Sequence, residues 1–454
     1  MSGKPVCGGR GCRVRMEGQR WLAGAIAGLA LLAMLGTVGR SVLAAGLAPP
    51  GPATAMAGAP SSSAGAPTPG PFELSQPAQA EAAGASGTDA AASPETLAQQ
   101  QLQGLDTTAI RGFLDALNAQ LGGAGVGWQS LGGFLRGQGL ISHPQRLVDA
   151  LWGVFVGQLR SSLRLLGELL VLVVFAAVLR QIQGAFESEG VARIADAAVF
   201  LALGAVALAG FTLAVQIARE AIGQLSSFMV ALLPAIVGLL AASGAPTTAG
   251  LLQPVILGAL DAVALLIRSL VFPLLLLAAV LDIVGAFSPQ FRLTSLTGLM
   301  RQVALGLMGV LLTIFLGVVT VQGAAGAVAD GVALRAAKYA TKAFVPVVGG
   351  LFADAAEIVL SSSFLLRSGL GMVGLLAVAL IAAVPVLKML ALWLVYRLAG
   401  ALAQPVGGEA TAQVLGGLAG TMSLLAMAVT AVGIMCFLSL SVLVGAGTAA
   451  FALR

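Results

Sequence analysis

The sequence predicts an all-α membrane protein that crosses the bilayer several times. Only 9% of its residues are charged, 58% are hydrophobic, and the mean hydropathy is +0.97. Soluble domains carry about 25% charged residues, so this composition is typical of membrane proteins. No Asp, Glu, Lys or Arg occurs in residues 197–218, 302–329, 368–387 and 410–453. A spanning helix needs ~20 apolar residues, which each of these stretches supplies.

Residues 1–45 are expected to be a secretory signal peptide or a first membrane anchor. Basic residues precede an apolar run from Trp21 to Leu35, and Val42-Leu43-Ala44 provides a small-residue cleavage site. The pI of about 9.6 comes from this leader, because acidic and basic residues balance from residue 46 onward. Nucleic-acid binding is therefore not expected.

Two further segments precede the predicted spans. Residues 46–100 are rich in Ala, Pro, Gly and Ser, cannot bury a core, and should form a disordered linker. Residues 101–160 should form an amphipathic helical extracytoplasmic segment. Its first helix has apolar residues at helical spacing, begins after Asp106 or Thr107 and ends at Gly122–Gly123. Its apolar faces could pack together, or bind a membrane surface or a partner.

Residues 161–454 should form the polytopic membrane domain, with about six to nine transmembrane or re-entrant helices. The segment 251–281 contains Asp261, Arg268 and Pro273, so it predicts either one kinked helix or two short ones. The candidate spans are 163–183, 197–218, 225–243, 251–281, 302–324, 345–366, 368–387, 389–405 and 419–448. The basic loop 325–343 is expected inside and residues 46–160 outside, if 251–281 crosses once.

The sequence lacks the residues that common enzyme classes require. His143 is its single histidine, which excludes H-E-x-x-H zinc sites, and no G-x-x-x-x-G-K-[ST] loop is present. The three cysteines predict neither a disulfide framework nor a metal cluster. We therefore predict no enzyme activity, no catalytic residue, no metal and no cofactor.

Ionisable residues at membrane depth are costly, so each is a candidate for function. Three of them are expected at span ends, where long side chains reach the interface: Glu168, Arg367 and Lys388. The others are Asp261, Arg268, Asp354, Glu357 and Arg397.

A pair of matched polar triplets predicts a helical hairpin over residues 331–366. Both triplets have the spacing i, i+3, i+7: Arg335, Lys338 and Lys342, and Asp354, Glu357 and Ser361. Helix-breaking residues lie midway between them: Pro346, Gly349 and Gly350. A hairpin folded there would pair the two triplets and lower the cost of burying the acids. The alternative is a basic loop followed by an ordinary span.

Several motifs resemble those of the stage III sporulation protein AE family of endospore-forming bacteria. They are A-x-G-V-x-L-R-x-A-K-Y-A (329–340), F-V-P-V-V-G-G-x-x-A-D-A-x-E-x-V-L (344–360), A-F-E-S-E (185–189), A-R-E-A-I (218–222), L-L-P-A-I-V-G-L-L-A-A-S-G (232–244) and V-G-A-G (444–447). The resemblance covers roughly residues 105–450.

The resemblance implies a multi-pass protein of the mother-cell membrane that surrounds the forespore. It implies a channel-like, secretion-like complex with other membrane and ring-forming proteins, which supports late forespore gene expression. Two alternatives stay open. One is a secondary transporter or permease whose site is the 331–366 hairpin, and the other is a purely structural scaffold.

Overall fold

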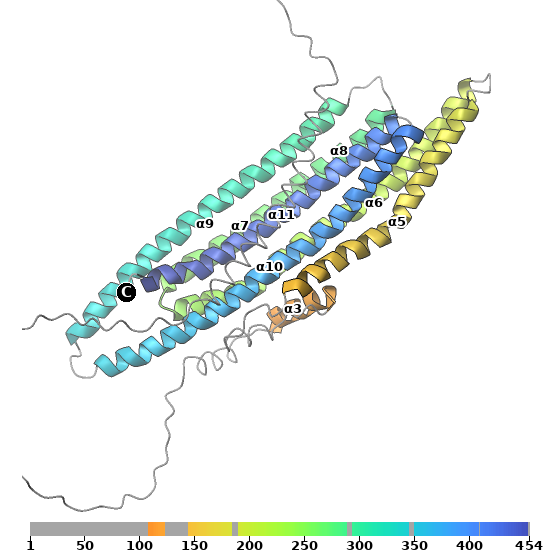
Figure 1. Cartoon of the computed structure of the whole chain (residues 1–454). Coiled ribbons are helices and arrows are strands. Elements are labelled where there is room, and N and C mark those ends of the chain that lie inside the picture. Colours follow the sequence, from red (N-terminus) through yellow and green to blue (C-terminus); the bar gives the residue numbers. More distant parts are fainter. Residues whose placement is uncertain are drawn as a thin grey trace, which may run out of the picture.

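The computed structural model describes residues 108–122, 144–183, 189–287, 293–344, 349–407 and 409–452. The predicted signal or anchor (1–45) and the predicted linker (46–100) lie outside these residues. The described elements are all helical (Figure 1): α3 (Thr108–Gln120), α5 (Pro144–Gln183), α6 (Glu189–Ala242), α7 (Pro246–Leu266), the π-helical η1 (Ile267–Val271), α8 (Phe272–Phe287), α9 (Thr294–Phe344), α10 (Gly349–Gly407) and α11 (Glu409–Ala452).

Six helical segments are long and apolar enough to cross a membrane, which confirms the predicted all-α polytopic fold. They run antiparallel to one another in chain order, with α7, η1 and α8 forming one continuous segment (Figure 1). The stretch 251–281 is therefore one helical segment, with its π-helical turn at Arg268.

Two groups of predicted spans, one of two and one of three, are in fact single helices. The stretches 197–218 and 225–243 both lie in α6, and 345–366, 368–387 and 389–405 fall almost entirely in α10. The expectation that 325–343 lies inside and 46–160 outside counted α6 as two passes. Because α6 is one helix, four helical segments separate the two regions: α5, α6, the α7–α8 segment and α9. If each segment crosses once, the two regions lie on the same side.

Helix α10 is the centre of the bundle. In its most apolar stretch 89% of the residues are buried, against 22% in α5 and 28% in α9. It packs mainly against α11, α5 and α6, whereas α9 packs against α7, α8 and α11 on the other side. Because α5 and α9 are edge helices, their many exposed Val and Leu side chains form much of the outer surface.

Helix α3 has the amphipathic pattern that the sequence predicts. Ile110, Leu114, Leu117 and Leu121 are buried, and Gly122 follows the helix with φ of +62°. Phe113 meets Phe228 of α6 edge to face, with ring centroids 5.7 Å apart. The apolar face of α3 therefore packs against α6 and α10.

The α6–α7 turn has the hydrogen bonds of a Schellman motif. Gly244 N–H donates to Ala241 O at 3.1 Å, and Ala245 N–H donates to Leu240 O at 3.2 Å. Gly244 has φ of +92°, a left-handed conformation in which a β-carbon is strained.

We predict that Gly244→Ala lowers the free energy of unfolding by about 1–2 kcal/mol, because alanine is strained at positive φ. Gly238→Ala is the matched control, since a β-carbon at this helical position of α6 meets no atom within 4 Å. Gly238→Ala should leave stability unchanged or raise it through better helix propensity. Thermal and denaturant unfolding of the detergent-solubilised protein measures both, and equal effects of the two variants would contradict the prediction.

Candidate functional site

A polar cavity of about 710 Å³ lies at one end of the bundle, where α8 leads to α9 and α10 leads to α11. Two guanidinium groups and two carboxyl groups line it, so its ionisable groups balance in charge. Its polar lining residues are Asp282, Thr294, Thr297, Arg301, Arg397, Gln404, Glu409 and Gln413. Small residues on α10 and α11, among them Gly400, Gly416 and Gly417, complete the wall.

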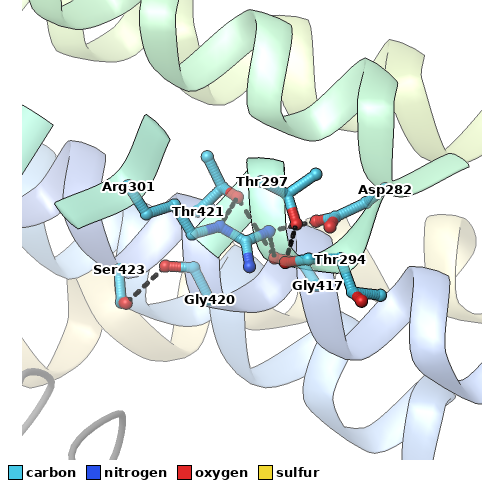
Figure 2. Close-up of polar contacts among 8 residues, drawn as sticks. All are labelled: Asp282, Thr294, Thr297, Arg301, Gly417, Gly420, Thr421 and Ser423. Carbon is cyan, nitrogen blue, oxygen red and sulfur yellow. Dashed lines mark hydrogen bonds and ion pairs between the residues drawn. The ribbon is translucent and has the colours of Figure 1, made fainter. Parts of the chain in front are cut away.

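Arg301 connects three helices at the wall of this cavity (Figure 2). Its Nε donates to Thr421 Oγ1 at 3.0 Å, and its Nη2 donates to Gly417 O at 2.8 Å. The same Nη2 forms an ion pair with Asp282. Since 11% of each paired side chain is exposed, α8, α9 and α11 are joined by a nearly buried charge pair.

The connection between α8 and α9 explains why these two residues meet. Asp282 lies near the end of α8, and Arg301 lies two turns after the start of α9. Two antiparallel helices with a short connection bring such positions side by side. An ionised group in an apolar bundle is expensive unless it is paired and hydrogen-bonded, and this pairing meets both needs.

Gly417 makes room for this ion pair. A β-carbon at Gly417 would meet the carboxylate of Asp282, whereas one at the neighbouring Gly416 would meet no atom within 4 Å. The backbone of α11 therefore approaches α8 and α9 closely at Gly417, and its carbonyl oxygen becomes a ligand of Arg301.

A second polar centre lies at the opposite end, at the α6–α7 turn. Asp330 of α9 accepts hydrogen bonds from the backbone N–H groups of Thr247 at 2.9 Å and Thr248 at 2.8 Å, and from the Thr248 hydroxyl. The N-cap of α7, Ala245, offers no side-chain cap. The carboxylate of Asp330 thus caps α7 from another helix, where a negative charge also suits the helix dipole.

Arg367 of α10 belongs to the same centre. Its Nη1 donates to Ser243 Oγ at 3.1 Å, and its side chain is fully buried at 0% exposure. The expectation that Arg367 reaches a membrane interface from a span end is therefore wrong. Burial against the α6–α7 turn gives the guanidinium a hydroxyl partner within the bundle instead.

Comparisons with known proteins identify the family. The family description "Stage III sporulation protein AE" matches residues 130–447. The stage III sporulation protein AE of Bacillus subtilis (strain 168) is 38% identical over 361 residues, which cover 79% of this chain and 90% of that protein. This chain belongs to the stage III sporulation protein AE family. No solved structure matches it.

Two segments that resemble the family meet in the second polar centre. The segment 232–244 ends in the Ser243–Gly244 turn, and the segment 329–340 contains Asp330. Asp330 therefore binds the start of α7, just after the first segment, through Thr247 and Thr248. The stage III sporulation protein AE family is not known as an enzyme family.

The predicted hairpin lies at this same end of the bundle. Its arms are helical in backbone, but they are the terminal parts of the long helices α9 and α10 rather than a short separate hairpin. Arg335, Lys338 and Lys342 belong to α9, and Gly349, Gly350, Asp354, Glu357 and Ser361 belong to α10. Pro346 and all these side chains lie outside the described part of the structure, so their pairing stays a prediction.

The other ionisable candidates that the structure describes lie on different faces and levels of the bundle. Glu168 is exposed and pairs with Arg164 at 3.0 Å, whereas Asp261 and Arg268 are exposed on the α7–η1 segment. Lys388 is half-buried, and Arg397 lines the polar cavity. Of the sequence candidates whose side chains the structure describes, only Arg397 therefore contributes to the cavity.

The sequence reasoning missed Asp282, Arg301 and Asp330 because they border or interrupt apolar runs and looked like ordinary flanking charges. The signal that could have found the first two is their opposite charge on consecutive helices, the same logic that predicts the 331–366 hairpin. Asp330 had no such signal, since its partners are backbone N–H groups more than eighty residues away.

We predict that Gly417→Ala destabilises the protein, because the new methyl group displaces Asp282 and leaves the buried Arg301 without its ion pair. Breaking a buried pair costs about 3–5 kcal/mol. Gly416→Ala adds the same methyl group one residue away and should leave the unfolding free energy unchanged. Unfolding of the purified protein in detergent measures the difference, and equal stability of the two variants would show that the close approach at Gly417 is not required.

Proposed function

We propose that this protein is a membrane subunit of the channel complex between mother cell and forespore. It would reside in the mother-cell membrane around the forespore and assemble there with other membrane and ring-forming proteins. The complex would support late forespore gene expression during sporulation.

Family membership combined with six membrane-length helices is the observation that carries this proposal. A polytopic subunit of a conduit needs lipid-facing edge helices and polar groups that are shielded from lipid. Edge helices α5 and α9 carry many of the exposed apolar side chains, and the Asp282–Arg301 pair is nearly buried in the bundle.

The polar cavity gives some support to a second function, that of a secondary transporter acting alone. Its volume and its balanced set of charged and amide side chains suit a small polar solute. Transport by the purified protein in liposomes, without any partner, distinguishes this function from a subunit of a larger complex.

We predict that the tagged protein co-purifies with ring-forming and membrane partners from sporulating cells, and that it restores late forespore gene expression in cells lacking their own copy. The variant Asp282→Asn/Arg301→Gln removes the charge pair while keeping similar side-chain shapes. This variant should lower forespore expression, and co-purification shows whether assembly persists. Glu168→Gln, an exposed position, is the control and should behave like the wild type.

Full forespore expression without any co-purifying partner would contradict the proposed function. Solute flux by the protein alone in liposomes, lost in the Asp282→Asn/Arg301→Gln variant, would favour the transporter. Normal expression with the charge-pair variant would favour a scaffold role for this part of the bundle.

We also propose that the two triplets pair across the 345–348 connection. Each triplet occupies one stripe of its helix, since residues three, four and seven apart share a helical face. Pairing would place Lys342 opposite Asp354 and Lys338 opposite Glu357. The charges at the ends of α9 and α10 would then neutralise one another.

We predict that cysteines at 342 and 354 form a disulfide readily in membranes, in a background where Cys7 and Cys12 are replaced by serine. A disulfide needs Cα atoms within about 7 Å of each other. Cysteines at 335 and 354 are the control, because this pair is out of register by seven residues, about 10 Å along a helix. Gel mobility after mild oxidation reports the bond, and equal cross-linking of both pairs would contradict the register.

A further inference from the structure

The helices are much longer than a bilayer is thick. The six candidate spans contain 33 to 46 residues. At 1.5 Å per residue they are about 50–70 Å long, whereas the hydrocarbon core measures about 30 Å. A single bilayer therefore covers only about half of the length of the bundle. The positions of charged and exposed residues show which half this is.

Charged residues of α6 and η1 lie at the same level. The helices are antiparallel, and a β-carbon added at Gly223 would lie 3.3 Å from Nη2 of Arg268. Arg219 and Glu220 are one turn from Gly223 on α6, and both are exposed, as is Arg268. These three charges thus lie near one another, midway along the bundle.

Lys388 of α10 lies at this level too. A β-carbon at Gly374 would lie 2.6 Å from Leu232, which fixes the register of α10 against α6. Lys388 follows Gly374 by fourteen residues, and Arg219 precedes Leu232 by thirteen. We name Arg219, Glu220, Arg268 and Lys388 the mid-height belt. It divides the bundle into a cavity half, which holds the polar cavity, and a turn half, which holds the α6–α7 turn.

The outer faces of α6, α7 and α8 differ between the two halves. In the cavity half, the exposed positions of α6 and α8 include the large apolar residues Leu201, Leu213, Leu276 and Leu277. In the turn half, most exposed positions of α6 and α7 are small or polar: Gln224, Ser227, Pro234, Gly238, Gly250, Pro254, Gly258 and Asp261. Large apolar residues are exposed there at three positions, Val230, Leu251 and Leu265. Lipid chains favour the first surface, and water favours the second.

Helix α3 adds independent evidence that the turn half is in water. Its contact partner Phe228 lies on the turn side of the belt, nine residues beyond Arg219. The outer face of α3 exposes Arg111, Asp115 and Gln120. A helix that turns these side chains outward at this level would place them in hydrocarbon if the turn half were embedded.

We propose that the cavity half is embedded in the bilayer, that the mid-height belt lies among the lipid phosphates, and that the turn half with α3 stands in water. The uncharged stretch 197–218 of α6 is about 33 Å long, which matches the hydrocarbon thickness. Three of the four belt charges are basic and suit anionic phosphate groups. The polar cavity then opens at the opposite membrane surface.

The edge helices agree with this placement to different degrees. On α5, Leu165 is level with Gly210 of α6, so the exposed residues Arg160, Arg164 and Glu168 lie on the cavity side of the belt. Arg164 and Glu168 form an ion pair of 3.0 Å there. After Glu168, the exposed face of α5 is apolar, with Val171, Val174 and Phe175. Helix α9 does not distinguish the halves, because exposed Val and Leu side chains occur along most of its length.

Single cysteines at two matched positions of α6 test the inference. Ser227→Cys lies in the turn half and Thr212→Cys in the cavity half, both at exposed positions about 22 Å apart along the helix. In proteoliposomes opened to both sides, a membrane-impermeant maleimide should label residue 227 at least an order of magnitude faster than residue 212. After solubilisation in a mild detergent, the micelle should still cover residue 212, whereas full denaturation should make both reactive.

Nitroxide labels at the same two cysteines show whether each position is in contact with lipid, with water or with protein. Oxygen concentrates in hydrocarbon and a nickel chelate stays in water, so the label at 212 should respond to oxygen and the label at 227 to the chelate. The parent protein with Cys7 and Cys12 replaced by serine, which retains the buried Cys436, serves as the blank.

The inverse pattern, with residue 212 in water and residue 227 in lipid, would overturn the proposal. The same environment at both positions, either lipid (response to oxygen) or water (response to the nickel chelate), would overturn it as well. The test requires only that the protein sits in a membrane. Its failure therefore leaves the proposed channel role open, and loss of partners in co-purification leaves this placement unaffected.

Discussion

The bundle depends on satisfying its buried polar groups from within, because side chains enclosed between long apolar helices cannot reach partners outside the bundle. At one end, the guanidinium of Arg301 is held by Asp282, Thr421 and a backbone carbonyl of α11. At the other end, the carboxylate of Asp330 caps α7. Each contact joins helices that are distant in sequence, so the same interactions that neutralise a charge also fix the register of the helices.

Glycines set how closely the central helices approach. A β-carbon at Gly433 of α11 would lie 2.7 Å from Ala382 of α10, and one at Gly374 of α10 would lie 2.6 Å from Leu232 of α6. Small residues at such crossings permit the backbone proximity on which helix packing in membranes relies. The most apolar stretch of α10 is consequently 89% buried, and the edge helices α5 and α9 provide much of the outer surface.

The candidate site contains contacts that sequence patterns can predict and contacts that they cannot. The pairing of Asp282 with Arg301 can be predicted from the sequence, because a short connection joins their helices and makes them pack antiparallel. The cap on α7 cannot be predicted in this way. Asp330 binds backbone N–H groups, and every residue except proline has one. Arg367 was misjudged for a related reason: its position after an apolar run resembles a span end, whereas Ser243 receives it inside the bundle.

The sequence by itself determined the class of the protein, the apolar stretches, the amphipathic face of α3 and the family, because composition, periodicity and motifs are local properties. Only the tertiary structure decided that 197–218 and 225–243 form one helix. Charges such as Arg219 and Glu220 look like the end of a span in a linear reading. A helix continues through them as long as its backbone hydrogen bonds are satisfied and its neighbours keep packing against it. The register of α6 with η1 and α10, which gathers the mid-height belt, likewise exists only once the helices are packed.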